Sequence, residues 1–305
     1  MNKGICDGVW PTMITPFTED NKVDYEGLEK IIEWYIKNGV DGLFAVCQSS
    51  EMFFLSLEER VKIAEFTVKK AAGRVPVIAS GHISDSIEDQ ITELKAIANT
   101  GVDALVLVSN RLASKDESDD IWKENAQKLL DAIPEVPLGF YECPYPYKRL
   151  ISPELLKWCA DTGRFYFLKD TCCDPDQLKA KVEAVKGTGL KIFNANTATL
   201  LESLRFGVSG FSGVMANFQS NLYVWLTKNW DKYPEKAEEL QWFLTLSALI
   251  ELQLYPVNAK YNMQLEGIDI SLHTRSKNAS AFSVANRIEV EQLHKMTKLY
   301  SRKLQ

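Results

Sequence analysis

The 305-residue sequence lacks several features that mark particular classes of protein. Lys and Arg form no basic cluster, and the net charge of -6 comes from interspersed acids and bases, so no nucleic-acid partner is expected. No apolar run approaches the roughly 20 residues that a membrane-spanning helix needs. Polar residues begin at once in Met1-Asn2-Lys3-Gly4, so we expect no secretory signal and a cytoplasmic protein.

Paired metal-binding and nucleotide-binding motifs are missing as well. The six cysteines have no CxxC spacing and no histidine partner pattern, so we interpret them as reduced thiols rather than disulfides or zinc ligands. The three histidines are scattered, and no metal site is expected. No GxGxxG or Walker loop follows any predicted strand, which argues against a nucleotide-binding sheet.

Short apolar runs instead alternate with amphipathic stretches along the chain. The predicted strands are 9–17, 42–46, 75–80, 104–108, 136–141, 164–169, 191–194 and 210–214. Helix signals separate them, such as the capping box formed by Ser56 and Glu59. Eight apolar strands with intervening helices predict an α/β fold, a (β/α)8 TIM barrel with additional C-terminal helices. We expect the barrel in residues 1–220 and a helical extension in 221–305, interrupted at Tyr255-Pro256.

Lys169 is the most informative single residue. It ends an aromatic and aliphatic run, and an N-cap with proline at the first helical position, Asp174-Pro175, follows shortly. Burial lowers the pKa of a lysine because desolvation penalises the charged form. The neutral amine can then condense with a ketone as a Schiff base. The alternative is a lysine whose ammonium reaches from the strand end into solvent.

Polar residues concentrate at the predicted carboxyl ends of the strands, where a (β/α)8 barrel carries its functional site. The candidates are Thr12, Gln48, Ser49, Ser50, His82, Tyr141, Glu142, Lys169, Asn196 and Ser212. Ser49 and Ser50 could bind the substrate, or they could equally be turn residues whose hydroxyls form hydrogen bonds with their own backbone. For His82, a side chain bonded to a neighbouring loop is an equally good interpretation. For Tyr141, the alternative to a functional role is a residue that caps the core.

Four segments, residues 10–17, 38–43, 210–217 and 255–260, occur in a characteristic order and spacing. They resemble the opening strand, the second strand, the eighth strand and the proline-containing C-terminal helix of one family. This is the dihydrodipicolinate synthase / N-acetylneuraminate lyase family, the pyruvate-dependent class I aldolases. The resemblance covers nearly the whole chain, and Tyr141 and Lys169 fall where the family has its catalytic tyrosine and Schiff-base lysine.

The resemblance implies a Schiff-base-forming lyase or aldolase that acts on pyruvate or a longer 2-keto acid. Lys169 would be the imine-forming nucleophile and Tyr141 the proton shuttle. Ser49, with Gln48 and neighbouring backbone amides, would hold the carboxylate of the keto acid. No metal and no organic cofactor are implied, because the lysine imine is the electron sink. The family commonly forms tetramers, so a homo-oligomer, tetramer or dimer, is expected.

The sequence departs from the family pattern around the second substrate. Gln48 stands where the synthase has the first hydroxyl of a proton relay, because residues 47–51 replace its Gly-Thr-Thr-Gly-Glu segment. In the family, a tyrosine from a partner subunit completes this relay; its position falls near Leu112 in this sequence, so the tyrosine is expected to be absent. The arginine that recognises the dicarboxylic second substrate falls at Pro146, and Arg149 replaces it only if the loop is rebuilt. New polar contacts there are expected from His82, Glu142, Arg111 and Asn196.

Three other functions stay open at this point. One is an authentic 4-hydroxy-tetrahydrodipicolinate synthase. Another is a non-catalytic keto-acid binding barrel, which the altered segment from Gln48 to Ser50 suggests. A metal-dependent class II aldolase is disfavoured, because only one of the three histidines lies at a predicted strand end.

Overall fold

The computed structural model describes residues 4–133 and 136–304, so residues 1–3, on which we partly based the expectation of no secretory signal, lie outside it. Eight parallel strands form one curled sheet in the order β1-β8-β7-β6-β5-β4-β3-β2. They are β1 (Gly8–Val9), β2 (Leu43–Phe44), β3 (Val77–Ala79), β4 (Ala104–Val108), β5 (Leu138–Tyr141), β6 (Phe165–Asp170), β7 (Lys191–Asn194) and β8 (Gly210–Phe211). A parallel bridge between Thr12 and Phe44 closes the ring. The predicted (β/α)8 barrel is confirmed.

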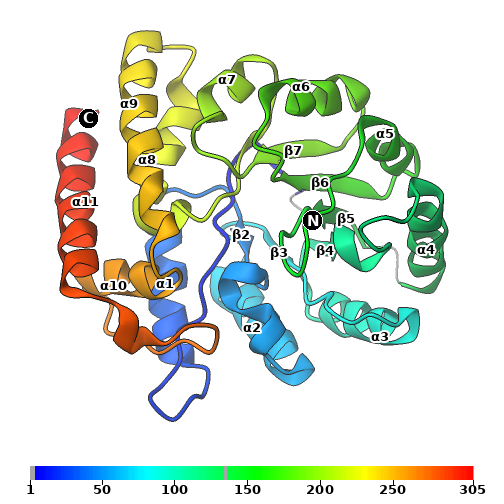
Figure 1. Ribbon diagram of the computed structural model, residues 1–305, viewed down its shortest axis with the longest axis horizontal. Helices are drawn as coiled ribbons and strands as arrows, with labels where there is room; N and C mark the ends of the chain where they lie inside the picture. The colour runs from blue at the N-terminus through cyan, green and yellow to red at the C-terminus, as the bar shows by residue number, and fades with distance from the viewer. Residues whose placement is uncertain (1–3, 134–135, 305) are drawn as a thin grey trace.

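Helices surround the ring, and the C-terminal helices gather on one side of it (Figure 1). The helices that alternate with the strands are α1 (Tyr25–Lys37), α2 (Leu57–Ala71), α3 (Ile87–Ala98), α4 (Asp119–Ala132), α5 (Pro153–Asp161), α6 (Pro175–Ala184), α7 (Leu200–Arg205) and α8 (Ala216–Asn229). The C-terminal helices are α9 (Pro234–Ser247), α10 (Val257–Leu265) and α11 (Val284–Lys303). Within residues 4–133 and 136–304, no helix combines the length and apolar character needed to cross a bilayer.

The predicted helix starts form as the sequence indicated. The Ser56 hydroxyl accepts a hydrogen bond from the Glu59 amide, and the Glu59 carboxylate accepts one from the Ser56 amide. The Asp174 carboxylate caps α6, which has Pro175 at its first position. The strands are shorter than several predicted runs, because only part of each run pairs with neighbouring backbone. The remainder of the first run continues beside β2, where Thr12 pairs with Phe44.

Gly210 lies where β1 and β8 approach each other most closely. A Cβ atom at this position would lie 1.9 Å from the carbonyl oxygen of Gly8. Because backbone surrounds the position, any side chain would separate the two strands that complete the ring. Glycine at residue 210 is therefore required by the barrel itself.

Aromatic side chains fill the barrel interior beneath the strand ends. The ring centroids of Trp10 and Phe167 are 5.7 Å apart, and those of Phe167 and Phe193 are 4.7 Å apart. Successive side chains of a strand point to opposite faces, so Phe167 and Lys169 of β6 share the inner face. The aromatic layer therefore forms a dry floor under Lys169.

The C-terminal region differs from the prediction in one respect. The expectation that Tyr255-Pro256 is its one interruption is wrong, because residues 266–283 also form no α-helix and contain only a short 3₁₀ turn, Ala279–Ala281. This loop returns to the barrel, where the Glu51 carboxylate accepts hydrogen bonds from the amides of Arg275 and Ser276. The predicted boundary between the barrel, residues 1–220, and the helical extension, residues 221–305, falls inside α8. The division into these two parts stays a prediction.

Candidate active site

Tyr141 and Lys169 meet at the carboxyl ends of two adjacent strands. Tyr141 ends β5, Lys169 is the penultimate residue of β6, and the register of the two strands pairs them. The Lys169 ammonium nitrogen lies 4.5 Å from the centre of the Tyr141 ring. Both side chains are buried, with exposed fractions of 3% and 4%. The structure therefore brings together the two residues at the centre of the sequence-based hypothesis.

Compared with water, the surroundings of Lys169 shift its protonation equilibrium towards the neutral amine. Burial lowers its pKa to about 8, while Cys47, Cys143 and Glu251 act in the opposite direction. In the part of the chain that the structure describes, no carboxylate lies within ion-pair distance of its nitrogen. The alternative of an ammonium in open solvent is excluded by this burial. Lys169 therefore loses its proton at a lower pH than an ordinary lysine does.

The Tyr141 hydroxyl donates a hydrogen bond to the side-chain oxygen of Gln48, at 3.1 Å. The Cys143 thiol donates to the same oxygen, at 3.3 Å. Burial raises the pKa of Tyr141 well above that of a free tyrosine. A carboxamide oxygen accepts protons in hydrogen bonds but carries none to pass on. Gln48 therefore orients the tyrosine without extending a hydroxyl relay.

Ser49, Ser50 and Thr12 lie together next to this pair but have different roles in the packing. Ser49 lines the cavity and its hydroxyl donates to the Thr12 hydroxyl, at 3.1 Å. The Ser50 hydroxyl contacts the carbonyl oxygens of Met13 and Ala45, at 2.9 and 2.8 Å. Ser50 is thus engaged in holding its own turn, which leaves Ser49 as the serine that faces the cavity.

Glu142 lies behind the strand ends rather than in the cavity. Its carboxylate and that of Asp170 each lie 2.5 Å from the ammonium nitrogen of Lys181, on α6. Glu142 also accepts hydrogen bonds from the amides of Ile151 and Thr171, both at 2.8 Å. Burial and the Asp170 charge raise the pKa of Glu142. These contacts fix the backbone immediately after Tyr141 and after Lys169.

His82 is buried in a neutral, fully bonded state. Its Nδ1 accepts a hydrogen bond from the Val108 amide at 3.0 Å, so the proton is on Nε2, which lies 2.8 Å from the Gln90 side-chain oxygen. Burial lowers the pKa of His82 to about 4. The geometry corresponds to the second possibility raised for this residue, a histidine bonded to neighbouring segments.

Asn196 and Ser212 are also engaged within the protein. The Asn196 side-chain oxygen accepts from the amide and the hydroxyl of Thr199, at 3.1 and 3.2 Å. The buried Ser212 hydroxyl donates to the Trp10 carbonyl, at 2.9 Å. Neither side chain is among those that line the cavity. Both position loops at the strand ends.

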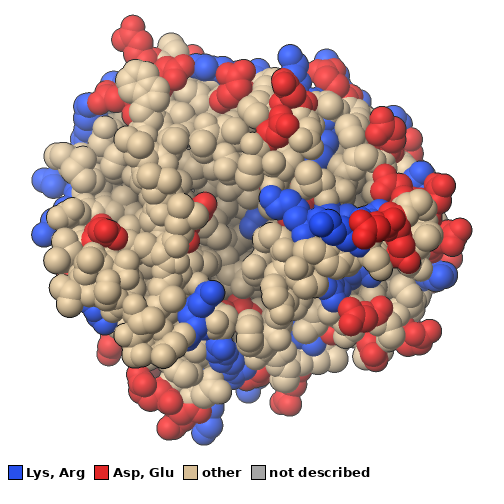
Figure 2. Space-filling view, in the orientation of Figure 1, with Lys and Arg blue, Asp and Glu red and all other residues tan. Residues whose placement is uncertain are grey.

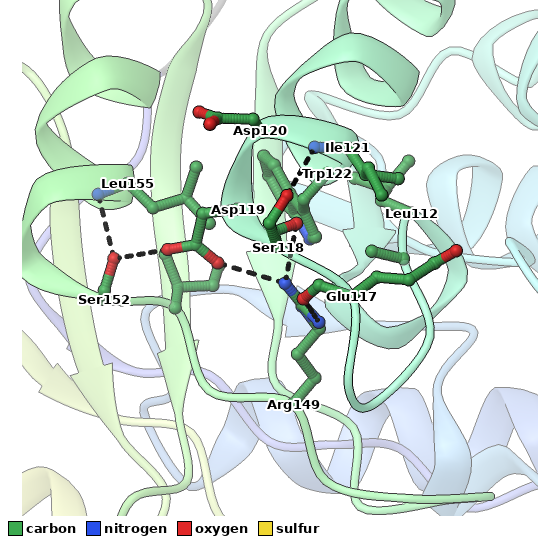
Figure 3. Close-up of polar contacts among 12 residues, drawn as sticks. Leu112, Glu117, Ser118, Asp119, Asp120, Ile121, Trp122, Arg149, Ser152 and Leu155 are labelled. Atoms are coloured by element: carbon green, nitrogen blue, oxygen red, sulfur yellow. Dashed lines mark hydrogen bonds and ion pairs between the residues drawn. The ribbon is translucent and has the colours of Figure 1, made fainter.

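Arg149 points towards the start of α4 (Figure 3), and it is not among the residues that line the cavity described below. Its guanidinium donates to the carbonyl oxygens of Ser114, Glu117 and Ser118 and pairs with Asp119 at 3.0 Å. These contacts hold it between two loops, so it does not replace the missing substrate arginine. Arg111 is likewise engaged outside the cavity and pairs with Asp85 at 2.8 Å.

A cavity of about 610 Å³ opens above Lys169. Figure 2 shows a hollow near the centre of the molecule, with uncharged atoms over much of its border. Its lining comprises Gln48, Ser49, Glu51, Phe53, Phe54, Tyr141, Pro144, Tyr145, Lys169, Thr171, Ala195, Val214, Glu251, Leu252, Tyr255, Pro256, Ser276 and Lys277. Sequence reasoning missed the part contributed by residues 251–256 and 276–277. No motif singled out Glu251 or Lys277, whereas Tyr255 lay in a segment that resembled the family.

A metal centre has no support in the side-chain arrangement. Within residues 4–133 and 136–304, no group of three or more His, Cys, Asp or Glu side chains is placed to hold a metal ion. Cys143 is buried and contacts Gln48, whereas Cys173 is exposed. The chemistry available at the strand ends is that of a buried amine and a phenol.

Comparison with known proteins gives one consistent family. The dihydrodipicolinate synthetase family matches residues 6–294. A 4-hydroxy-tetrahydrodipicolinate synthase of Clostridium perfringens is 31% identical over 217 residues, 71% of each chain. The enzyme of the same name from Bacillus subtilis is 28% identical over 261 residues, which cover 85% of this chain and 88% of the other.

Solved structures agree with this assignment. An E. coli prophage protein of the dihydrodipicolinic acid synthase family, in complex with pyruvate, has a TM-score of 0.86 at 24% identity, covering 96% of this chain and 99% of that one. A monomeric dihydrodipicolinate synthase variant has a TM-score of 0.87 at 20% identity, over 96% and 97%. These likenesses establish the fold. The family match confirms the prediction of an enzyme of the class I aldolase type. The chain belongs to the dihydrodipicolinate synthetase family, whose members are Schiff-base-forming, pyruvate-dependent lyases.

Proposed function

We propose that Lys169 forms an imine with pyruvate or a longer 2-keto acid, and that the protein makes or breaks the carbon–carbon bond next to that imine. The observation that carries this proposal is the buried, partly neutral amine 4.5 Å from the Tyr141 ring, in the lining of the cavity. An amine with a lowered pKa is a nucleophile near neutral pH.

The reaction then follows from the chemistry of the two side chains. The Lys169 amine attacks the ketone carbon, and the former ketone oxygen leaves as water, which gives a protonated imine. This imine withdraws the electron pair of an adjacent C–H or C–C bond, so that an enamine forms while a proton or an aldehyde departs. Tyr141 supplies and receives the protons at the reacting oxygen. In this proposal the Ser49 hydroxyl, which lines the cavity, binds the carboxylate of the keto acid.

Reductive trapping tests the proposal directly. The protein is incubated with pyruvate and borohydride, digested and analysed by mass spectrometry. We expect one carboxyethyl adduct, on the peptide that contains Lys169. Absence of an adduct, or an adduct confined to another lysine, would refute the proposal. Deuterium exchange into the methyl group of pyruvate, followed by NMR in D₂O, reports enamine formation and excludes a barrel that only binds keto acids.

The trapping rate should depend on pH in a way set by Lys169. With a pKa of about 8, the free amine is a minor species at pH 7 and the major one at pH 9. We expect the initial rate with cyanoborohydride to rise about tenfold between these pH values and then to level off. A rate that kept rising in proportion to hydroxide beyond pH 9 would indicate an ordinary, unperturbed lysine.

Tyr141→Phe should lower the rate of methyl-proton exchange by about 10²–10⁴-fold, because proton transfer by a positioned side chain contributes that much. The variant removes one hydroxyl and its hydrogen bond to Gln48, and it retains the ring beside Lys169. Tyr166→Phe is the matched control on β6, since the Tyr166 hydroxyl donates a hydrogen bond to the Gly163 carbonyl, away from the cavity lining. Equal exchange rates in the two variants would exclude Tyr141 as the proton shuttle.

Authentic 4-hydroxy-tetrahydrodipicolinate synthase activity has weaker support. It would require recognition of a dicarboxylic second substrate, and Arg149 is bonded to four groups elsewhere. Aspartate semialdehyde should therefore react poorly with the pyruvate-loaded protein. Consumption of this aldehyde in a coupled assay, at a rate above that of the methyl-proton exchange, would instead favour authentic synthase activity over a lyase that acts on other keto acids.

We also propose a homo-oligomer, dimer or tetramer, in the cytoplasm. Exposed apolar side chains of α9 and the following 3₁₀ segment, Trp242, Leu246 and Leu249, offer a surface for contact between copies. The unpaired state of the six cysteines suits a reducing compartment. Analytical ultracentrifugation tests the assembly, and a monomer at micromolar concentration would contradict it.

A further inference from the structure

Glu251 places a carboxylate without a partner in the wall of the cavity. It belongs to the 3₁₀ segment Ala248–Leu252 and lines the same cavity as Lys169. In the described part of the chain, its side chain makes no hydrogen bond and no ion pair. Burial raises the pKa of Glu251, and the Lys169 charge opposes this change. A half-buried carboxylate of this kind has hydrogen-bonding capacity that the protein leaves unused.

The other charged groups near the cavity leave no guanidinium for a second substrate carboxylate. Glu51 is neutralised by Lys260 and holds the amides of Arg275 and Ser276. The Arg275 guanidinium is engaged by Glu59. Lys277, at the exposed rim, is the remaining cation of the lining besides Lys169. Among the described residues, the lining therefore offers no arginine side chain to bind a second substrate carboxylate.

The outer wall of the cavity is apolar. The rings of Phe53 and Tyr145 pack edge to face with centroids 4.7 Å apart. Phe54 is 49% exposed and Leu252 is 79% exposed, although both line the opening. Exposed apolar side chains around a concave opening are typical of a surface that an apolar group of a ligand covers.

We infer that Glu251 selects keto acids whose tail, beyond the imine-forming carbon, carries a hydroxyl or ammonium donor on an apolar segment, and that it rejects tails that end in a carboxylate. The inference rests on the proposed imine at Lys169. A second carboxylate would face Glu251 without an arginine, and like charges in a half-buried site repel. A donor would satisfy the Glu251 oxygens, while the apolar segment would contact Phe53, Phe54 and Leu252.

The test uses trapping at Lys169 as its readout, with four keto acids at concentrations well below saturation. Pyruvate has no tail, 2-oxoglutarate has a carboxylate tail, 2-oxo-4-phenylbutanoate has an apolar tail, and its ring-hydroxylated analogue adds a donor. Relative to pyruvate, we expect the hydroxylated analogue to be trapped fastest among the three tailed acids. We expect 2-oxoglutarate to be trapped at least about tenfold more slowly than that analogue, as a difference of one charge contact allows.

Variants of Glu251 assign the preference to this residue. Glu251→Gln should reduce the difference between the hydroxylated analogue and 2-oxoglutarate to about threefold or less, and Glu251→Lys should reverse it. Lys277→Gln is the control for the rim cation and should preserve the order. Urea unfolding of each variant verifies that the fold is intact, and among the described residues no hydrogen bond or ion pair of the Glu251 side chain would be lost.

The outcomes separate the inference from the function on which it rests. If pyruvate is not trapped at Lys169, both are refuted. If pyruvate is trapped but the wild-type protein prefers 2-oxoglutarate or does not discriminate, only the inference about Glu251 is refuted. If Glu251→Gln slows all four acids equally, Glu251 is a counter-ion of Lys169 rather than a specificity residue, and the inference is again wrong.

Discussion

Lys181→Met should lower the free energy of unfolding by about 3–5 kcal/mol, which is the usual cost of removing one partner from a buried ion pair. Lys181 is the cation between Glu142 and Asp170, and all three side chains are almost completely inaccessible to solvent. Burial alone would lower the pKa of Lys181, but the two carboxylates outweigh it and raise the pKa. The ammonium therefore stabilises the fold throughout the neutral range, since that stability is lost only as pH rises through the raised pKa.

Urea unfolding of the variant and of Lys179→Met provides the measurement. Lys179 is exposed on the same helix, so its substitution should change stability by no more than about 0.5 kcal/mol. The deficit of Lys181→Met should shrink towards pH 5, because protonation of one carboxyl removes an unpaired buried charge. Adding Glu142→Gln to Lys181→Met should restore part of the loss. If Lys181→Met were as stable as Lys179→Met, the ion pairs of Lys181 with Glu142 and Asp170 would contribute nothing to the stability of the fold.

The position of Glu142 shows where the sequence-based prediction of the site reached its limit. Glu142 was expected near the substrate because it follows Tyr141 at a strand end. Consecutive strand residues point to opposite faces, so when Tyr141 and Lys169 point inward, Glu142 and Asp170 point outward towards α6. The alternation was readable from the sequence. The identity of Lys181 as the partner was not, since it depends on how α6 packs.

Elements with local signals were predicted well. The capping box at Ser56 and the capped start of α6 depend on contacts within four residues, so the sequence is sufficient to specify them. The β7 strand has its predicted bounds. The sequence also placed Tyr141 and Lys169 at the ends of neighbouring strands, because a lysine at the end of an apolar run is unusual and the preceding predicted strand ends in tyrosine.

Contacts between distant segments could not be predicted in the same way. Whether Arg149 faced the substrate depended on a loop path, and that loop instead brings it to the carbonyl oxygens before α4 (Figure 3). Glu251 reaches the cavity from a 3₁₀ segment between two C-terminal helices, and no periodic pattern marks it. The fold and the positions of Tyr141 and Lys169 at strand ends thus follow from local patterns, whereas the other side chains that line the cavity depend on tertiary packing.

Lys169→Met should abolish trapping and lower the rate of methyl-proton exchange by at least about 10⁴-fold, because the thioether cannot form an imine and loss of a covalent nucleophile has effects of this size. The same variant should raise the free energy of unfolding by about 1–3 kcal/mol at pH 7. In the wild-type protein, the folded-state pKa of Lys169, about 8, lies below that of a lysine in the unfolded chain. At pH 7, burial of the charged ammonium therefore opposes folding. Methionine fits a lysine-shaped site without that charge.

The sign of this second effect distinguishes a functional lysine from a structural one. The destabilisation caused by Lys169 is complete below pH 8 and disappears as pH approaches the unfolded value of about 10.4. Denaturant midpoints of wild type and Lys169→Met should therefore differ at pH 7 and converge near pH 10. Since Lys181→Met is the identical substitution at another buried lysine, opposite signs for the two variants are expected. A loss of stability in Lys169→Met at pH 7 would mean that the amine has a charged partner in the folded protein and is not held ready as a nucleophile.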